Sequence, residues 1–207
     1  MLFLQLVLLV VLLPDGDSED VFQEPISFRI ILTLSLYNRS WTQNFASAWL
    51  DERQTHSWNK TGAFIFLWPW SKGNLSNEEV ITAEESLYSN IIGMPQCFHD
   101  HFSEWQLEYP LQLAGGCELH FGAPSVGFMR IAYQGSDLVS FQNTSWWPSP
   151  TGGSRAQQVC RLLNEDHEDN ELMHKLIIDY CPHYLSSLLD AGKADLQQQG
   201  QSCSLPS

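Results

Sequence analysis

Apolar and polar residues alternate through residues 26–37, ISFRIILTLSLY, with Ile31 and Tyr37 on the otherwise polar side. One side of this segment carries Ile26, Phe28, Ile30, Leu32, Leu34 and Leu36. Successive side chains of a strand point to opposite faces, so this pattern predicts a half-buried strand in an antiparallel sheet. Shorter segments bounded by Gly, Pro, Asn and Ser predict further strands at 45–50, 63–68, 106–113, 117–121, 127–133 and 138–142.

A helix is predicted to begin at the capping-box sequence Ser76-Asn77-Glu78-Glu79 and to run to about Trp105. Apolar residues then recur at intervals of three or four, as one face of a helix requires. They are Ile91, Met94, Phe98, Phe102 and Trp105. Pro95 is expected to kink this helix or to divide it in two.

A second helical region is predicted near the C-terminus, from Glu171 to a C-cap at Gly192. Its apolar stripe consists of Leu172, Leu176, Ile177, Tyr180, Cys181, Tyr184, Leu185, Leu188 and Leu189. A shorter helix is predicted at 155–164, and the acidic residues 165–171 between the two are interpreted as a solvated loop. Strands and helices grouped in this order predict an α+β fold with helices on one face of an antiparallel sheet.

The first residues indicate export. Residues 2–13 are apolar except for Gln5 and stop at Pro14, a run too short to span a bilayer, so we predict a signal peptide at 1–17. A buried N-terminal helix is the alternative. Four glycosylation sequons agree with the secretory pathway, at Asn38, Asn59, Asn74 and Asn143, and should lie at the surface. About 190 residues remain for one domain.

The net charge and the absence of catalytic motifs argue against several classes of function. The net charge of −14 argues against binding to nucleic acid or to anionic membranes. The sequence has no nucleophile elbow, P-loop or HExxH motif, so we predict that it is not an enzyme and uses no cofactor. His99, Asp100 and His101 would point in different directions on a helix, so we interpret them as a solvated polar face rather than a metal site.

Several long motifs resemble one family: LDERQTHSW (50–58), PWSKGNLSNEE (69–79), GGCELH (115–120), AYQGSDLVSFQN (132–143) and CPHYLSSLLDAGK (181–193). The chain resembles the CD-one family of MHC class I-like glycoproteins, which present lipids to T cells. The match extends from the leader to about Gln199 and is strongest with the group-one members.

The resemblance implies an MHC class I-like groove domain over residues 18–199. An eight-stranded antiparallel sheet would form the floor and two helical walls would lie across it, with lipid acyl chains between them. The floor positions are Phe28, Ile30, Leu32 and Leu34. One wall would present Ile91, Met94, Phe98 and Phe102, and the other Leu176, Ile177, Tyr180 and Tyr184. Periodicity alone does not distinguish such a groove from a plain core.

The resemblance also implies a disulfide. Five cysteines allow ten pairs, and the family bond joins the cysteines of the GCELH and CP motifs, here Cys117 and Cys181. Some relatives carry a partner for Cys160 in the preceding loop, but this chain has Thr151, Gly152 and Gly153 there. Cys160 is therefore expected to be a buried free thiol. Cys97 is assigned to the first long helix and Cys203 to the tail.

The chain departs from the family at the groove opening. Relatives place arginines near lipid headgroups in the first helix, whereas residues 88–93 contain none. An acidic residue and a threonine that contact headgroups in relatives correspond to Asp169 and Met173, so only the acid is kept. We therefore expect altered or weakened headgroup recognition.

Residues 200–207 resemble nothing in the family, and we expect them to form a divergent tail without an immunoglobulin-like domain or membrane anchor. In relatives that domain supplies much of the contact with beta-2-microglobulin, so we expect this partnership to be weakened. The chain is expected in the secretory pathway and extracellular space, with the cell surface and endosomes as further locations in relatives.

Two functions follow. The first is a lipid-antigen-binding module recognised by a T-cell receptor. The second is a secreted MHC-like interaction or decoy protein, or a truncated product with an empty groove. A continuous apolar cavity between the helices would favour the first, and close-packed side chains there would favour the second.

Overall fold

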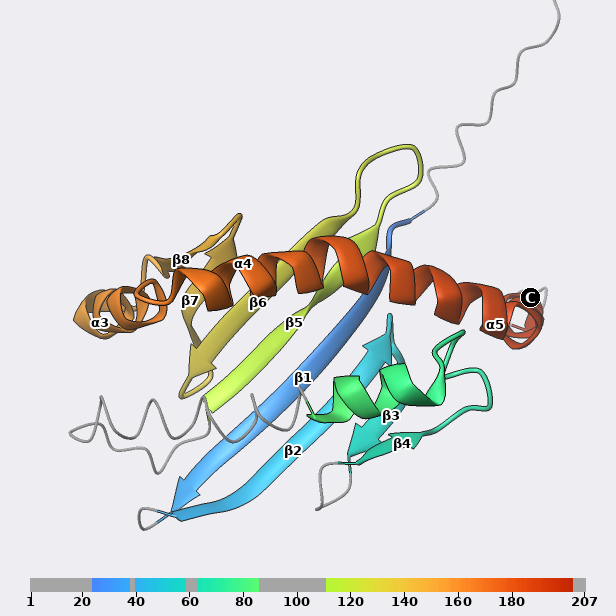
Figure 1. Cartoon of the computed structure of the whole chain (residues 1–207), viewed down its shortest axis with the longest axis horizontal. Helices are drawn as coiled ribbons and strands as arrows, with labels where there is room; N and C mark the ends of the chain where they lie inside the picture. The colour runs from blue at the N-terminus through green and yellow to red at the C-terminus, as the bar shows by residue number, and fades with distance from the viewer. Residues whose placement is uncertain (1–23, 38–39, 59–62, 86–110, 203–207) are drawn as a thin grey trace, which may run out of the picture.

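The computed structural model describes residues 24–37, 40–58, 63–85 and 111–202. Its strands form one eight-stranded antiparallel sheet in the order β4-β3-β2-β1-β5-β6-β7-β8, as Figure 1 shows. They are β1 (Ile26–Tyr37), β2 (Ser40–Leu50), β3 (Arg53–Trp58), β4 (Phe64–Phe66), β5 (Leu111–Leu119), β6 (Val126–Tyr133), β7 (Ser136–Gln142) and β8 (Ser145–Pro148). The antiparallel sheet and the α+β class are confirmed.

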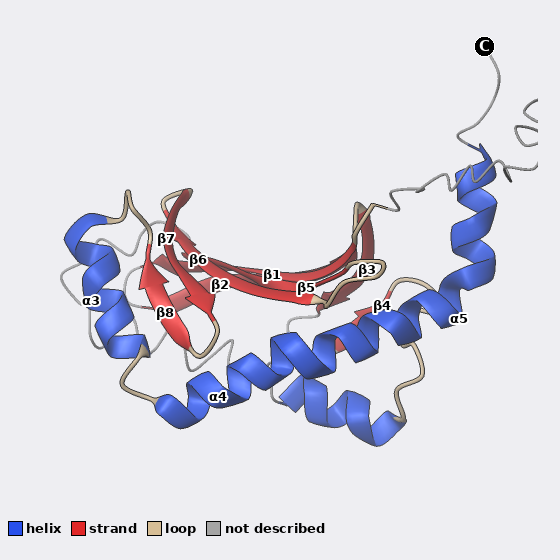
Figure 2. Cartoon of the chain, turned by 90° about the horizontal axis from the view of Figure 1, so that it is seen from above, coloured by secondary structure: helices blue, strands red, loops and turns tan. Residues whose placement is uncertain are grey.

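The helices lie on one side of this sheet. A helix over residues 77–85 crosses the β3–β4 half, and the second helical region contains α3 (Gly153–Leu163), α4 (His167–Lys175), the π-helical turn η1 (Leu176–Tyr180) and α5 (Cys181–Ser202). Figure 2 shows α4, η1 and α5 as one long run beside the sheet, with α3 at the β8 end.

Strand register assigns each residue to a face. β1 pairs Phe28 with Leu50 of β2 and with Cys117 of β5. Phe28 contacts Tyr184 of α5 with ring centroids 5.2 Å apart, so its face is the one beneath the helices. We call this the upper face, and the opposite face, which includes Ile31, the lower face.

Two apolar clusters fill the space between the upper face and the helices. The first, the α3-end core, consists of Leu34, Leu111, Leu113, Ile131, Tyr133, Leu138, Val139, Phe141, Trp146, Ala156, Val159, Cys160 and Ile177. The second, the α5-end core, consists of Phe28, Ala48, Leu50, Trp70, Cys117, Leu185 and Leu188. Both cores combine alternate strand positions with one helix face, as helix-on-sheet packing requires.

Three strand predictions need correction. β3 and β8 were not predicted, because the buried Thr55 and His56 interrupt the apolar pattern of β3 and β8 is only four residues long. The predicted strands 106–113 and 117–121 are replaced by the single strand β5, although residues 106–110 lie outside the described part. Gly115 and Gly116 suggested a break, yet both continue the register with β1 and β6.

The predicted acidic loop at 165–171 is also wrong, because α4 begins within it. The Asp166 side chain accepts a hydrogen bond from the Asp169 amide at 3.0 Å, which makes Asp166 the N-cap. Asp and Glu are favourable in a first helical turn, where they face the positive end of the helix dipole. A cluster read as solvated loop is therefore a helix start.

Gly192 is not a C-cap, since α5 continues through it to Ser202. A side chain at this position would meet the ring of Trp70 at 2.9 Å. The glycine therefore allows α5 to approach Trp70 of the α5-end core, rather than ending the helix.

The predicted apolar stripe of the second helical region is not uniformly buried. Ile177, Leu185 and Leu188 are buried, but Leu172 and Tyr180 are 52% and 63% exposed. The π-turn explains part of this difference. The π-helical turn spans Leu176–Tyr180 and is wider than an α-helical turn. The prediction assumed a constant period of 3.6 residues, so side chains after the turn point in directions other than those expected.

Candidate groove site

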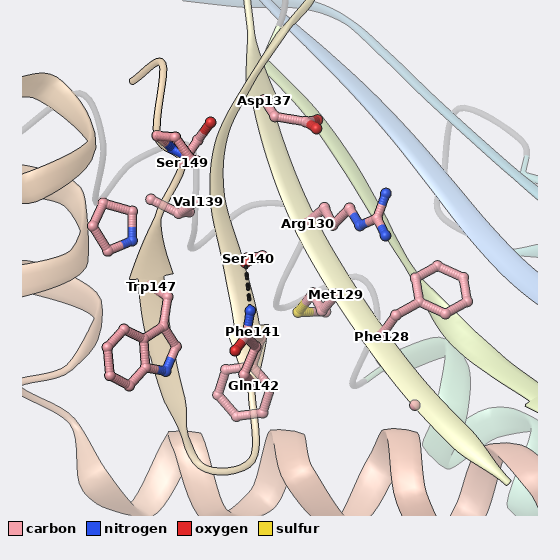
Figure 3. Close-up of a pocket in the computed structure, with 13 residues that line it drawn as sticks. Phe128, Met129, Arg130, Asp137, Val139, Ser140, Phe141, Gln142, Trp147 and Ser149 are labelled. Carbon is pink, nitrogen blue, oxygen red and sulfur yellow. Dashed lines mark hydrogen bonds between the residues drawn. The ribbon is translucent and has the colours of Figure 1, made fainter. Parts of the chain in front are cut away.

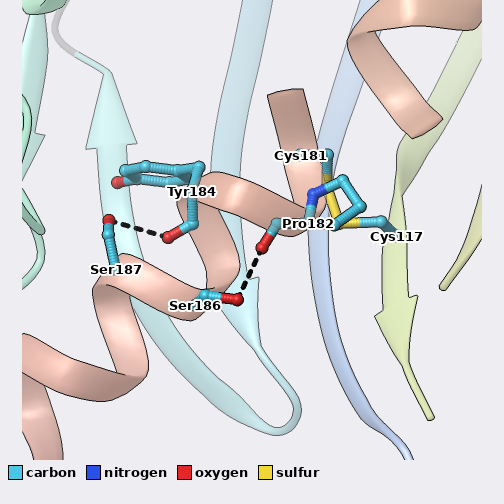
Figure 4. The surroundings of a disulfide bond; sticks show 6 residues. All are labelled: Cys117, Cys181, Pro182, Tyr184, Ser186 and Ser187. Carbon is cyan, nitrogen blue, oxygen red and sulfur yellow. Dashed lines mark hydrogen bonds between the residues drawn. A yellow bond between two sulfur atoms is a disulfide. The ribbon is translucent and has the colours of Figure 1, made fainter. Parts of the chain in front are cut away.

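A disulfide fixes α5 to the floor. Cys117 of β5 and Cys181, the first residue of α5, are bonded, with their Cα atoms 5.9 Å apart (Figure 4). The pairing implied by the family resemblance is confirmed. The bond closes a loop with a sequence separation of 64, which contributes about 4 kcal/mol in the chain-entropy model.

A glycine permits the second close contact between wall and floor. A Cβ atom on Gly127 of β6 would lie 2.7 Å from the Ile177 carbonyl oxygen of η1. Any side chain there would push the π-turn away from the sheet. The wall therefore lies directly on β6 at this point, one strand from the disulfide.

The four predicted floor residues share the upper face but differ in burial. Phe28 and Leu34 are buried, in the α5-end and α3-end cores respectively. Ile30 and Leu32, between them on β1, remain half-buried. The middle of the floor is therefore an apolar strip that the described helices do not fully cover.

The second wall contributes residues of several kinds. Ile177 is buried and Met173 packs at the edge of the α3-end core, while Leu176 is half-buried. Tyr184 reaches the floor, but the largely exposed Tyr180 does not pack on it. Asp169 is exposed in the first turn of α4.

The first wall is described only at its beginning. Ile91, Met94, Phe98 and Phe102 lie outside the described residues, as does the His99–His101 cluster. The capping box is confirmed, since Ser76 N donates to Glu79 Oε2 at 2.8 Å and Glu79 N donates to Ser76 Oγ at 3.2 Å. Hydrogen bonds that the Glu79 carboxylate accepts from the Ser76 backbone amide and, to a lesser extent, from the Ser76 side chain lower the pKa of this carboxyl.

Sequence reasoning missed a buried polar network between β3 and α5. His56 Nε2 lies 2.8 Å from Tyr184 Oη, and the Tyr184 hydroxyl donates to the Ser71 carbonyl at 2.7 Å. On the other side of the ring, His56 Nδ1 lies 2.8 Å from Thr55 Oγ1. Desolvation lowers the pKa of His56 to about 4, against a smaller opposing effect of the Ser71 backbone, and desolvation raises the pKa of Tyr184.

The only sequence signal for this network was a histidine and a threonine at adjacent positions in LDERQTHSW, which interrupt an otherwise plain strand. The partner of His56 is Tyr184 on α5, 128 residues further along the chain, and Tyr184 in turn bonds to Ser71 in the turn before the first wall, 113 residues from Tyr184. No local pattern encodes contacts at such a separation.

The sequence of the chain also matches a known protein family. A family model described as an MHC-I family domain matches residues 1–195. The chain belongs to the MHC-I family. An eight-stranded antiparallel sheet with helices on one face agrees with this membership.

Within this family the chain groups with the CD1 glycoproteins. It is 57% identical over 202 residues to the T-cell surface glycoprotein CD1a of Sus scrofa, covering 96% of this chain and 60% of that protein. It is 46% identical to CD1a and 47% identical to CD1c of Homo sapiens, in each case over 96% of this chain and 62% and 61% of those proteins. The chain thus spans about 60% of the length of the curated relatives it matches.

Two sequons of this MHC-I family chain lie in the described part. Asn74 and Asn143 are both exposed, as glycan transfer requires. Asn143 adopts a positive φ of 58° in the turn between β7 and β8, where its carbonyl oxygen lies 2.6 Å from His174 Nδ1 of α4. Asn38 and Asn59 lie outside the described residues.

Cys160 is the free cysteine of the described part and is buried in the α3-end core, as predicted. Burial raises the pKa of its thiol to about 11. The described residues contain no group of three or more His, Cys, Asp or Glu side chains that would hold a metal ion. Among them, no helix is both long enough and apolar enough to cross a membrane.

The lower face of the sheet carries an open hollow of about 660 Å³ over β6, β7 and β8 (Figure 3). Register assigns several of its lining residues to this face: Phe128, Arg130, Asp137, Ser140, Gln142 and Trp147. This hollow is separate from the groove site, which lies on the upper face.

Proposed function

We propose that this chain forms the groove of a lipid-presenting glycoprotein and holds acyl chains between its helical walls and the upper face. The observation that carries the proposal is the half-buried apolar strip at Ile30 and Leu32 on the upper face, where Ile30 packs at the edge of the α5-end core and Leu32 at the edge of the α3-end core. An acyl chain that covers this strip gains about 0.8 kcal/mol for each methylene removed from water. Membership of the MHC-I family supports the same function.

The two residues expected near the lipid headgroup, Asp169 and Met173, favour binding with little headgroup specificity. Asp169 is exposed on α4 and its amide is used in the helix cap, while the half-buried Met173 offers a thioether in place of a hydroxyl. A thioether is a weak acceptor and donates no hydrogen bond. Binding energy would therefore come mainly from the buried tail, and lipids with different headgroups should bind with similar affinity.

Two neighbouring substitutions test this proposal. Leu32→Arg places a charge on the upper face, where an unpaired charge costs several kcal/mol, so it should abolish loading of a fluorescent fatty acid. Thr33→Arg is the matched control, because Thr33 lies on the lower face in the next position of β1. It should leave loading unchanged.

The measurement is mass spectrometry of lipids extracted from the folded secreted variants. A folded Leu32→Arg protein that carries the same lipids as wild type would refute the floor assignment. The groove interpretation would then give way to a plain core.

Exposed apolar residues on the lower face favour a partner protein as well. Phe45, Ile65, Val126 and Trp147 are 43% to 59% exposed, and the register assigns all of them to this face. Contiguous apolar patches are typical of interaction surfaces, and these four residues give the lower face exposed apolar groups on β2, β4, β6 and β8. We propose that this face binds beta-2-microglobulin, the partner implied by the family resemblance.

Co-expression with beta-2-microglobulin tests this partnership. Phe45→Ser should reduce co-purification at least tenfold, because Phe45 is an aromatic residue and the most exposed of these four side chains. Leu172→Ser is the control, since Leu172 is similarly exposed but lies on α4. Equal loss in both variants, or no complex with wild type, would favour the alternative of an MHC-like protein that acts without this subunit.

A further inference from the structure

The lower-face hollow of about 660 Å³ combines aromatic and polar side chains, as a carbohydrate-binding site does. Figure 3 shows Trp147 of β8 on one side and Phe128 of β6 on the other, with Ser140 and Gln142 of β7 between them. Trp147 is 55% exposed. Aromatic rings pack on the apolar C–H faces of sugars, while hydroxyl and amide groups hydrogen-bond to sugar hydroxyls. A hollow of this volume is typical of a ligand site.

Two charged side chains complete the lining of the hollow. Arg130 of β6 and Asp137 of β7 lie on the lower face, at positions paired with Ser140 and Ala132 respectively. Within the described residues, neither side chain has an ion-pair or hydrogen-bond partner. The guanidinium offers several donors and the carboxylate several acceptors. A neutral ligand with many hydroxyl groups would therefore satisfy both.

A glycosylation sequon lies at the rim of the hollow. Asn143 directly follows Gln142, in the turn between β7 and β8, and is exposed. Its carbonyl oxygen accepts a hydrogen bond from His174 Nδ1 of α4 at 2.6 Å, so α4 covers the upper-face side of this turn. A large group attached to Asn143 therefore finds room on the lower-face side.

The distance between this turn and the exposed indole suits the start of an N-glycan. Trp147 pairs with Ser140, which precedes Asn143 by three residues. Three residues of an antiparallel strand span about 10 Å. The paired N-acetylglucosamine units that begin an N-glycan cover that distance. Because they would be tethered at Asn143, their effective concentration at the hollow would be high.

We propose that Asn143 carries an N-glycan whose first two sugars pack in the lower-face hollow against the indole of Trp147. The Asn143 amide nitrogen gives up a proton and bonds to C1 of the first sugar, while the bond between C1 and a lipid diphosphate donor breaks. In the folded chain, Arg130 and Asp137 hydrogen-bond to the hydroxyl and acetamido groups of the two sugars. The glycan thereby removes an exposed tryptophan from water.

The packed glycan divides the lower face between two occupants. It covers the end of the sheet formed by β6, β7 and β8. Phe45 of β2 and Ile65 of β4, at the other end of the strand order, stay exposed for the proposed partner protein. Trp147 then belongs to the glycan site and not to the surface that this partner contacts.

Radical footprinting with peptide-resolved mass spectrometry tests the proposal on the full chain secreted from mammalian cells. Oxidation of Trp147 is compared before and after enzymatic removal of the glycans under native conditions. Because Trp147 is 55% exposed in the bare polypeptide, glycan removal should raise its oxidation rate at least about threefold. Tyr180, which is 63% exposed on η1, is the internal control, and its rate should not change.

Two sequon variants form a matched pair. Asn143→Gln should reproduce the faster oxidation of Trp147. Asn74→Gln should leave Trp147 protected, because Asn74 lies beside α5, where its amide donates to Ser187 Oγ at 3.5 Å. A third variant, Trp147→Leu, keeps an apolar side chain but has no ring. NMR signals of the N-acetyl methyl groups should be shifted upfield by the indole in wild type, and this shift should vanish in Trp147→Leu.

Equal oxidation of Trp147 with and without the glycan would overturn the proposal, as would mass spectrometry that finds no glycan on Asn143. Protection that persists after glycan removal and depends on beta-2-microglobulin would also overturn it, and would assign Trp147 to the surface that contacts the partner protein. The comparison before and after glycan removal uses the wild-type chain, so it decides the matter even if a variant fails to fold.

Discussion

The two ends of the sheet are covered in different ways. At the α3 end, buried Leu34, Ile131, Val139 and Val159 pack together, and amide and indole groups make hydrogen bonds beside them. At the α5 end, the apolar cluster is smaller and is supplemented by the Cys117–Cys181 disulfide and the His56 network. The α3 end is therefore held mainly by side-chain packing. The α5 end is also held by the disulfide and the His56 hydrogen bonds, which a reductant or a change in pH can affect.

The polar contacts at the α3 end illustrate the contrast. Trp146 Nε1 donates to Asn170 Oδ1 at 3.1 Å, and Asn170 Nδ2 donates to the Leu163 carbonyl at 2.9 Å. Asn164 exchanges two hydrogen bonds with the Trp146 backbone. None of these amide and indole groups titrates between pH 4 and 8, so these contacts should be insensitive to acid and to reductant. Within the described residues, the α5 end combines the Cys117–Cys181 disulfide with a buried histidine.

The largest expected effect comes from breaking the disulfide. Cys181→Ser should lower the free energy of unfolding by about 4 kcal/mol, because the unfolded chain regains the freedom of a 64-residue loop. Chemical denaturation of the purified chain measures this loss. Reduction of the wild type with dithiothreitol should reproduce it.

Cys160→Ala is the matched control at the other end. It removes one buried sulfur from the α3-end core and should cost about 1 kcal/mol. If the two variants were equally destabilised, the disulfide would have no special part in holding the α5 end, and the contrast between the ends would fail.

The elements that sequence predicted correctly depend on short-range patterns. β1 was predicted with its observed bounds, because alternation over twelve residues leaves one interpretation. The capping box at Ser76 and Glu79 is likewise a four-residue signal. The Cys117–Cys181 bond joins distant segments, and it was available only through resemblance to a family.

The features that sequence did not predict depend on tertiary contacts. Thr55 and His56 hid β3, since buried polar residues are stable there only because Ala48, Ser71 and Tyr184 supply partners. The π-turn at 176–180 changed the side on which later residues fall, and Tyr180 became exposed. The spacing of apolar residues in the sequence does not reveal a hydrogen-bond partner on another element. It also does not reveal an extra residue in a helical turn.

The second prediction sharpens the contrast at the α3 end. Asn170→Ala should lower the free energy of unfolding by about 2 kcal/mol, because Trp146 Nε1 and the Leu163 carbonyl lose their partner in a buried site. The loss should be the same at pH 7.5 and pH 5, as measured by denaturation at both values. A loss that changed by more than about 1 kcal/mol between them would mean that the α3 end also contains a group that titrates in this range.

The smallest effect is a change in labelling rate, with Cys160 as a reporter of the α3 end. Its pKa of about 11, against 9.0 for an ordinary cysteine, leaves about a hundredfold less thiolate at pH 7.5, and burial adds to the protection. Maleimide labelling of Cys160, followed by peptide-resolved mass spectrometry so that Cys97 and Cys203 are scored separately, should be at least about a hundredfold slower than for a free cysteine. His56→Gln and Cys181→Ser should leave this rate within about threefold of wild type in folded protein, because they loosen only the α5 end. Rapid labelling of Cys160 in Cys181→Ser would show that both cores open together, and the two ends would then form one cooperative unit.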